Sequence, residues 1–134
     1  DVYKRQDLSV KFAVAESCSI YKSSWMEKFG EWKHVYCAGH LNQGGKLTWT
    51  VAVSKPGVYH LDIKARGKGR VVWKAETDEG HAIQNQQGVS DIFCDRQIGW
   101  ISFEKAGTHT ITVNQLEGGD VEVSSITLVP VNFE

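Results

Sequence analysis

Hydrophobic and polar residues alternate with a period of two along most of the chain, whereas a sustained period of 3.6 is nearly absent. The alternation is clearest in 46–53, KLTWTVAV, and it recurs in 59–65, 70–76 and 109–113. Because successive side chains of a strand point to opposite faces of a sheet, each segment predicts a strand with one buried face. The residues expected in the core are Leu47, Trp49, Val51, Tyr59, Leu61, Ile63, Ile111 and Val113.

Turns rich in glycine separate these segments. Lys55-Pro56-Gly57 joins a proline, which fixes φ, to a glycine, which tolerates positive φ, and RGKG at 66–69 is a second turn. About nine or ten short strands at intervals of roughly 8–12 residues are typical of an all-β fold. The pattern therefore predicts an antiparallel β-sandwich with jelly-roll topology.

Three segments carry weaker signals. Val10, Phe12 and Val14 alternate with polar or small residues and predict a half-buried strand. Residues 24–27 have the S-x-x-E form of a capping box, which predicts a single helical turn. One or two strands are expected over 91–104, broken at 95–97.

Trp100 follows Gly99 and is out of phase with Ile101 and Phe103. This phase predicts the outer face of a sheet, unless a bulge at Gly99 returns the side chain to the core.

Composition places the chain among single globular domains. It has 134 residues, of which 41% are hydrophobic and 23% charged, and it is too short for a (β/α)₈ barrel of about 250 residues. No apolar run approaches the roughly 20 residues of a membrane helix, and no signal-peptide pattern opens the chain. Fifteen basic and sixteen acidic residues give a net charge of −1 without a basic stripe. Neither nucleic acid nor a membrane is therefore expected as a partner, and we expect a monomer.

The first six residues, DVYKRQ, join no pattern that follows. They look like the in-frame translation of a transposon end used to prepare sequencing libraries, which would be the mark of a gene assembled from a metagenome. We therefore expect one domain over 7–134, preceded by a scar over 1–6. The alternative is an ordinary frayed N-terminus.

The three cysteines are Cys18, Cys37 and Cys94, an odd number without C-x-x-C spacing. Free packing residues are the favoured interpretation, with a Cys18–Cys37 bridge as the alternative. In a strand, Cys37 would face away from His34 and His40, so we expect no metal there.

Catalytic motifs are not evident. The chain contains no G-x-S-x-G, P-loop or H-E-x-x-H pattern. Asp78 and Glu79 fall in a turn, where neighbouring carboxylates are ordinarily solvated. We therefore expect no enzymatic activity from this domain.

The segment 73–87 has the residue types that bind sugars, namely an aromatic ring with many hydroxyl partners. The candidate ligand-binding residues are Trp73, Lys74, Glu76, Asn85, Gln87, Trp25 and Trp32. On this hypothesis, replacing Asn85 and Gln87 by alanine abolishes glycan binding and leaves unfolding almost unchanged. The alternative is that Trp73 is a core residue, in phase with Val71 and Ala75, and that the amides occupy an edge strand. Trp25 and Trp32 are open to three interpretations: a sugar platform, a docking surface or burial.

The order of elements is more specific than the alternation. Ala15-Glu16, GGKLTWTVAVSKPGVYHLDIKA, GWISFEKAGTHTITV and SSITLVPV follow one another. This order resembles galactose-binding-like jelly-roll modules that accompany glycoside hydrolases. SWMEKFGEWKH and VVWKAETDEGHAIQNQQ resemble the C-terminal β-sandwich of bacterial α-L-fucosidases.

The resemblance implies a noncatalytic carbohydrate-binding or accessory module of a secreted or periplasmic glycoside hydrolase. Its partners would be a glycan or the catalytic domain, and the alternative is an interdomain-packing sandwich without ligand. Such modules often hold a structural calcium, for which Glu16 fits one position, but Ser124-Ser125 stand where an aspartate is wanted. Because calcium prefers charged oxygen ligands, we expect no cofactor and no metal.

Overall fold

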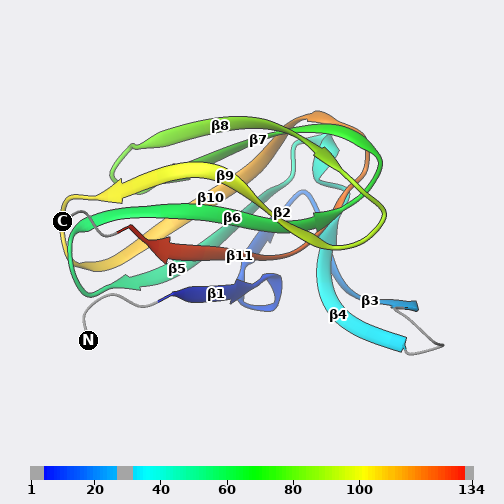
Figure 1. Cartoon of the computed structure of the whole chain (residues 1–134), viewed down its shortest axis with the longest axis horizontal. Helices are drawn as coiled ribbons and strands as arrows, with labels where there is room; N and C mark the ends of the chain where they lie inside the picture. The colour runs from blue at the N-terminus through cyan, green and yellow to red at the C-terminus, as the bar shows by residue number, and fades with distance from the viewer. Residues whose placement is uncertain (1–4, 27–31, 132–134) are drawn as a thin grey trace.

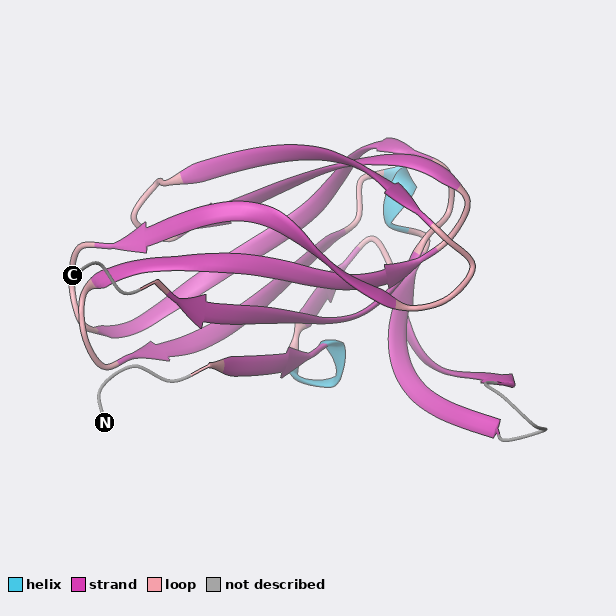
Figure 2. Cartoon of the chain, in the orientation of Figure 1, coloured by secondary structure: helices cyan, strands magenta, loops and turns pink. Residues whose placement is uncertain are grey.

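The chain folds into two antiparallel sheets packed face to face (Figures 1 and 2). The computed structural model describes residues 5–26 and 32–131, apart from the side chains of residues 25, 26, 32, 33 and 43. Within these ranges the elements are β1 (Gln6–Ser9), η1 (Val10–Phe12, a 3-10 turn), β2 (Val14–Glu16), β3 (Ser19–Met26), β4 (Trp32–Gly39), η2 (Leu41–Gln43, a 3-10 turn), β5 (Lys46–Val53), β6 (Gly57–Arg66), β7 (Gly69–Thr77), β8 (Ala82–Val89), β9 (Cys94–Phe103), β10 (Gly107–Gly118) and β11 (Glu122–Pro130).

The six-stranded sheet has the order β3-β4-β11-β6-β9, and β1 also pairs with β11. The five-stranded sheet has the order β2-β5-β10-β7-β8. β4 meets β11 through the single pair Ala38–Val123, and Figure 1 shows the β3–β4 hairpin bending away from the sandwich. The predicted antiparallel jelly-roll β-sandwich is confirmed.

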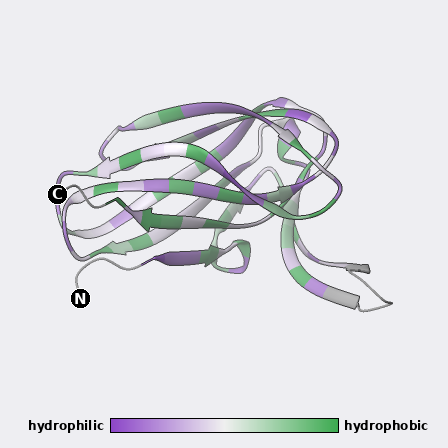
Figure 3. Ribbon diagram, in the orientation of Figure 1, coloured by the Kyte–Doolittle hydropathy of each residue, from purple (hydrophilic) through white to green (hydrophobic). Residues whose placement is uncertain are grey.

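The core lies between the sheets and follows from the alternation, which Figure 3 shows along β6. All eight residues expected in the core are buried. Trp49 and Trp73 are the largest buried side chains, one on β5 and one on β7. Among the described residues, no helix is long and apolar enough to cross a bilayer.

The N-terminal prediction fails in part. Val10 is buried, but Val10–Phe12 form a 3-10 turn in place of a strand, and the side chains of Phe12 and Val14 are exposed. The turn rotates Phe12 away from the core, which period-two alternation cannot anticipate. β1 begins at Gln6 and pairs with β11, while the domain boundary at residue 7 stays a prediction.

The helical turn predicted at 24–27 is wrong for its first three residues, because Ser24 to Met26 continue strand β3. Pairing with β4, such as Ser24 with His34, satisfies the backbone there and outweighs the local capping signal. Residue 27 lies outside the described residues. The break predicted at 95–97 is also wrong, since β9 runs continuously from Cys94 to Phe103.

Candidate functional site

The β7–β8 hairpin carries the segment proposed from sequence, and its register divides the candidates between two faces. Trp73 pairs with Asn85, and Val71 with Gln87, so the two amides share the inner face with the fully buried Trp73. Lys74 and Glu76 lie on the outer face of the sheet. The structure therefore does not bring the four polar candidates together, and their role in ligand binding stays a prediction.

Asn85 and Gln87 are half-buried and make hydrogen bonds within the protein. Gln87 Nε2 donates to Asn85 Oδ1 at 3.1 Å and to the Gln97 carbonyl oxygen at 3.4 Å, which links β8 to β9 across the edge of the sandwich. These contacts give the two amides a structural role that their polar character alone does not indicate.

The double substitution Asn85→Ala and Gln87→Ala is now expected to lower the free energy of unfolding by about 1–2 kcal/mol, because it removes bonds between half-buried groups. Gln84→Ala with Gln86→Ala is the matched control, since both side chains are exposed on the same strand. Urea denaturation of the two double variants measures the difference. Equal stabilities would contradict the structural role.

Trp25 and Trp32 lie at the end of the β3–β4 hairpin where β3 finishes and β4 begins, and there Trp25 pairs with Lys33 and Trp32 with Met26. Their side chains lie outside the described residues, so the three interpretations of these two residues stay open.

Trp100 is exposed on the outer face of the six-stranded sheet. A bulge at Ile98 breaks the β6–β9 register, since Leu61 pairs with Gly99 but Asp62 pairs with Gln97. The extra residue places Ile98 in the core and leaves the Trp100 side chain 48% exposed. The outer-face prediction for Trp100 is therefore confirmed.

Polar residues of β6 and β9 lie beside Trp100 on the same face. His60 is the direct cross-strand partner of Trp100, and Asp62 and Gln97 form the next outward-facing pair. Gly99 packs closely on Ile83 of β8, because a Cβ at position 99 would lie 3.1 Å from Ile83 Cδ1. We call the outward surface of His60, Asp62, Gln97 and Trp100 the Trp100 face. It combines an aromatic plane with hydrogen-bonding groups on two paired strands.

A pocket of about 330 Å³ lies at the end of the sandwich where β6 ends. We call it the loop-end pocket, and its lining residues are Arg66, Gly67, Lys68, Asp91, Asp120 and Glu122. Arg66 Nε donates to Glu122 Oε1 at 2.6 Å, and Arg66 Nη2 donates to Ser23 Oγ at 2.7 Å. The guanidinium also lies 4.8 Å from the centroid of the Phe93 ring, so that ring is covered.

The Glu122 carboxylate accepts hydrogen bonds from residues that are distant in the sequence. The Tyr21 hydroxyl and the Cys37 thiol both donate to Glu122 Oε2. Burial works to raise the pKa of Glu122, but the hydrogen bonds from Tyr21 and Arg66 outweigh it and hold the pKa below its ordinary value. Burial and the neighbouring carboxylate raise the pKa of Cys37 to about 11, so the thiol stays protonated and poorly nucleophilic.

The three cysteines are free, with Cys37 buried and Cys18 and Cys94 half-buried. The alternative Cys18–Cys37 bridge is therefore not formed. On β4, His34 is exposed while Cys37 is buried, in agreement with opposite faces of a strand. His40 is also exposed, but it lies beyond the end of β4.

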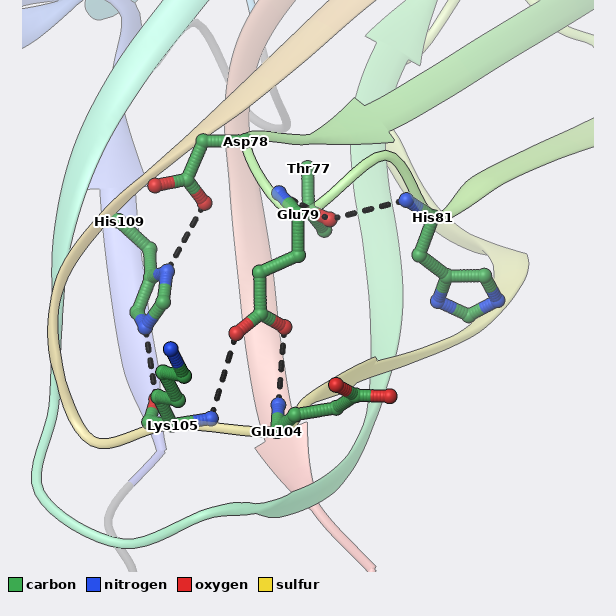
Figure 4. Close-up of polar contacts among 7 residues, drawn as sticks. All are labelled: Thr77, Asp78, Glu79, His81, Glu104, Lys105 and His109. Atoms are coloured by element: carbon green, nitrogen blue, oxygen red, sulfur yellow. Dashed lines mark hydrogen bonds and ion pairs between the residues drawn. The ribbon is translucent and has the colours of Figure 1, made fainter.

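A cluster at the opposite end of the sandwich joins the β7–β8 turn to the β9–β10 turn (Figure 4). His109 bonds to Asp78, and Glu79 accepts from the backbone N–H groups of Glu104 and Lys105 at 2.8 and 3.2 Å. Asp78 and Glu79 are therefore more than the solvated turn residues expected from sequence. They hold two turns together.

The calcium site implied by the resemblance does not fit the residues present. Glu16 is exposed on β2 of one sheet, whereas Ser124 and Ser125 lie on β11 of the other, and Ser124 is buried. These positions provide one carboxylate, and calcium prefers six to eight oxygen ligands that include several charged ones. Within the described ranges, no three His, Cys, Asp or Glu side chains are arranged to hold a metal.

Sequence reasoning missed the loop-end pocket and the polar partners of Trp100. Arg66 and Glu122 are 56 residues apart, and no local motif joins them. The signal for the Trp100 face was the phase of Trp100 relative to Ile101 and Phe103, which indicated the outer face without identifying the neighbours of the indole.

Comparisons with known proteins identify the fold. No protein-family model matches the chain, and no curated protein sequence matches it. The Podospora anserina GH26-CBM35 β-(1,4)-mannanase is similar over 100% of this chain and 29% of its own, with 17% identity and a TM-score of 0.78. The insecticidal crystal protein Cry2Aa is similar over 96% of this chain and 22% of its own, with 17% identity and a TM-score of 0.69.

The C-terminal CBM6 of LamC, a marine laminarinase from Zobellia galactanivorans, is similar to this chain over nearly its whole length. It is similar over 94% of this chain and 99% of its own, with 11% identity and a TM-score of 0.62. The chain spans less than a third of the mannanase and of the crystal protein. Since all three identities are low, the likeness shows the architecture alone: this chain has the β-sandwich fold that these three proteins share.

Proposed function

We propose that this domain is a noncatalytic carbohydrate-binding module that contacts glycan through the Trp100 face. The observation that carries the proposal is a tryptophan 48% exposed on the outer face of the six-stranded sheet, beside the polar residues His60, Asp62 and Gln97. The C–H side of a sugar ring packs on an aromatic plane, and hydroxyls take donors and acceptors around it. The Trp100 face provides both.

The expected affinity is weak. The face is open, and each hydrogen bond in such a site contributes about 0.5–1.5 kcal/mol net. A dissociation constant near 1 mM corresponds to about −4 kcal/mol. A module of this kind would act by holding an attached catalytic domain close to its substrate, where effective concentration multiplies a weak contact.

The attached domain would be the catalytic domain of a secreted or periplasmic bacterial glycoside hydrolase. The likeness to sandwiches in a mannanase and a laminarinase supports this class. An α-L-fucosidase is the proposed parent, supported by the two sequence segments SWMEKFGEWKH and VVWKAETDEGHAIQNQQ. Fucosylated glycans are therefore the first ligands to test, beside mannan and β-1,3-glucan.

Trp100→Ala is expected to weaken glycan binding at least about tenfold, because it removes the stacking plane. Loss of a half-buried side chain costs about 1–2 kcal/mol of stability, so the variant stays folded. Glycan-array screening of the domain followed by calorimetry on the best ligand measures the affinity. Tyr36→Ala is the control, since Tyr36 is an exposed aromatic on β4. Equal affinities in the two variants would place the glycan elsewhere.

Domain packing without a ligand is the second candidate function. Phe12, Val14 and Tyr36 are exposed, and Lys11, the chain neighbour of Phe12, has its Nζ 5.2 Å from the centroid of the Tyr36 ring. Exposed apolar side chains in this part of the surface suit docking against another domain. Failure of the unmodified domain to bind any glycan on the array would favour this candidate over the first.

A further inference from the structure

His109 lies near the start of β10 with its side chain turned inward and only 8% exposed. Its ring packs on Phe103 with a centroid separation of 4.8 Å, and Val51 of β5 is its cross-strand partner. The buried imidazole therefore has little access to water. Its hydrogen bonds must come from the protein.

Both ring nitrogens face oxygen atoms that can only accept. Nδ1 lies 2.9 Å from Asp78 Oδ1, and Nε2 lies 2.7 Å from the Lys105 carbonyl oxygen (Figure 4). A neutral imidazole has one N–H and one lone pair, so either tautomer would set a lone pair against one of these oxygens. The imidazolium ion alone donates to both.

We propose that His109 is a proton-dependent latch, doubly protonated at neutral pH, which ties the β7–β8 turn to the β9–β10 turn and releases one of them when it loses a proton. The proposal is independent of glycan binding, since it rests on the geometry of the two turns.

The two carboxylates near the ring favour the same state. The β7–β8 turn brings Asp78 and Glu79, the β9–β10 turn brings the Lys105 carbonyl oxygen, and β5 and β9 bring the apolar Val51 and Phe103. The ammonium group of Lys105, whose side chain Figure 4 draws, is a like charge and opposes protonation. Burial of the ring works to lower the pKa of His109. The hydrogen bonds to Asp78 and Lys105 and the two negative charges outweigh burial, so the pKa lies above its ordinary value of 6.5.

The sign of the pH dependence follows. A raised pKa in the folded state means that the latch contributes its full stability below the unfolded value near 6.5 and loses it as pH rises through the folded value. Release would also loosen the neighbouring contacts of Glu79 with Glu104 and Lys105. A pocket of about 270 Å³ between the turns, lined in part by Glu79 and Glu104, would change shape with them.

Two measurements test the latch. Nitrogen-15 chemical shifts of the His109 ring in the unmodified protein are expected to show two protonated nitrogens at neutral pH. Protection of the Glu104 and Lys105 amides from hydrogen exchange should fall about tenfold or more above the His109 pKa, while amides in the centre of β10 keep theirs. A neutral tautomer at neutral pH would overturn the proposal, whatever the variants do.

Asp78→Asn is the decisive variant. Its amide can donate to Nδ1, so a neutral ring keeps both contacts, and the His109 pKa should fall by at least one unit with loss of the pH-dependent exchange. Asp120→Asn is the matched control, because Asp120 lies beside a different histidine, with 3.8 Å between His40 Nδ1 and Asp120 Oδ2. An unchanged titration of His109 in Asp78→Asn would overturn the assigned role of the carboxylate.

Discussion

Trp73→Ala is expected to lower the free energy of unfolding by about 3–5 kcal/mol, because it empties the centre of a close-packed core. The side chain is fully buried on β7, between the strands that carry Gln115 and Asn85. Chemical denaturation gives the magnitude. Glu76→Ala is the control on the outer face of the same strand, with a change within about 0.5 kcal/mol.

The result also decides between the two interpretations of Trp73. A core residue predicts lost stability, whereas a sugar platform predicts lost glycan affinity with stability retained. Trp73→Phe should lower the free energy of unfolding by less than Trp49→Phe. Trp73 Nε1 has no hydrogen-bond partner among the described residues, whereas Trp49 Nε1 donates to the Ser9 carbonyl oxygen at 2.9 Å. The reverse order would contradict this account of the core.

Glu122→Ala is expected to lower the free energy of unfolding by about 2–3 kcal/mol. The substitution leaves Arg66, Tyr21 and Cys37 without their shared acceptor in a part-buried site. Thermal or urea denaturation at neutral pH measures the loss. Glu117→Ala, an exposed carboxylate on β10, is the control and should change stability by at most about 0.5 kcal/mol.

The same carboxylate determines part of the acid sensitivity. Since the pKa of Glu122 is lower in the folded protein than its ordinary value of 4.5, its contribution is present above that value and is lost as pH falls through the folded pKa. Glu122→Gln should therefore unfold with a weaker dependence on pH in the acid range than the unmodified domain. An unchanged acid transition would show that other carboxylates dominate it.

Alternation was sufficient to identify the sandwich and its core. Leu47, Trp49 and Val51 are buried because period two is the geometry of a strand, and burying one face of each strand is the dominant gain on folding. The phase of Trp100 relative to Ile101 likewise indicated the outer face, and the structure decided against the core alternative. Both inferences depend on positions within one strand.

Tertiary structure decided which side chains share a face or meet, because this depends on the register between strands and on which turns lie side by side. Asn85 and Gln87 fell on the inner face, away from Lys74 and Glu76, because the β7–β8 register relates the two strands. Phe12 shows the converse, since it alternates correctly but a 3-10 turn directs it to solvent.

The hydrogen bonds of the polar clusters are the features that the sequence predicts least. Tyr21 and Glu122 are 101 residues apart, and Asp78 and His109 are 31 apart, yet each pair forms a hydrogen bond. Period-two alternation reports only whether a side chain faces the core, because burial depends on strand geometry alone. Which acceptor meets which donor depends on the packing of whole strands and turns, and that exists only in the folded chain.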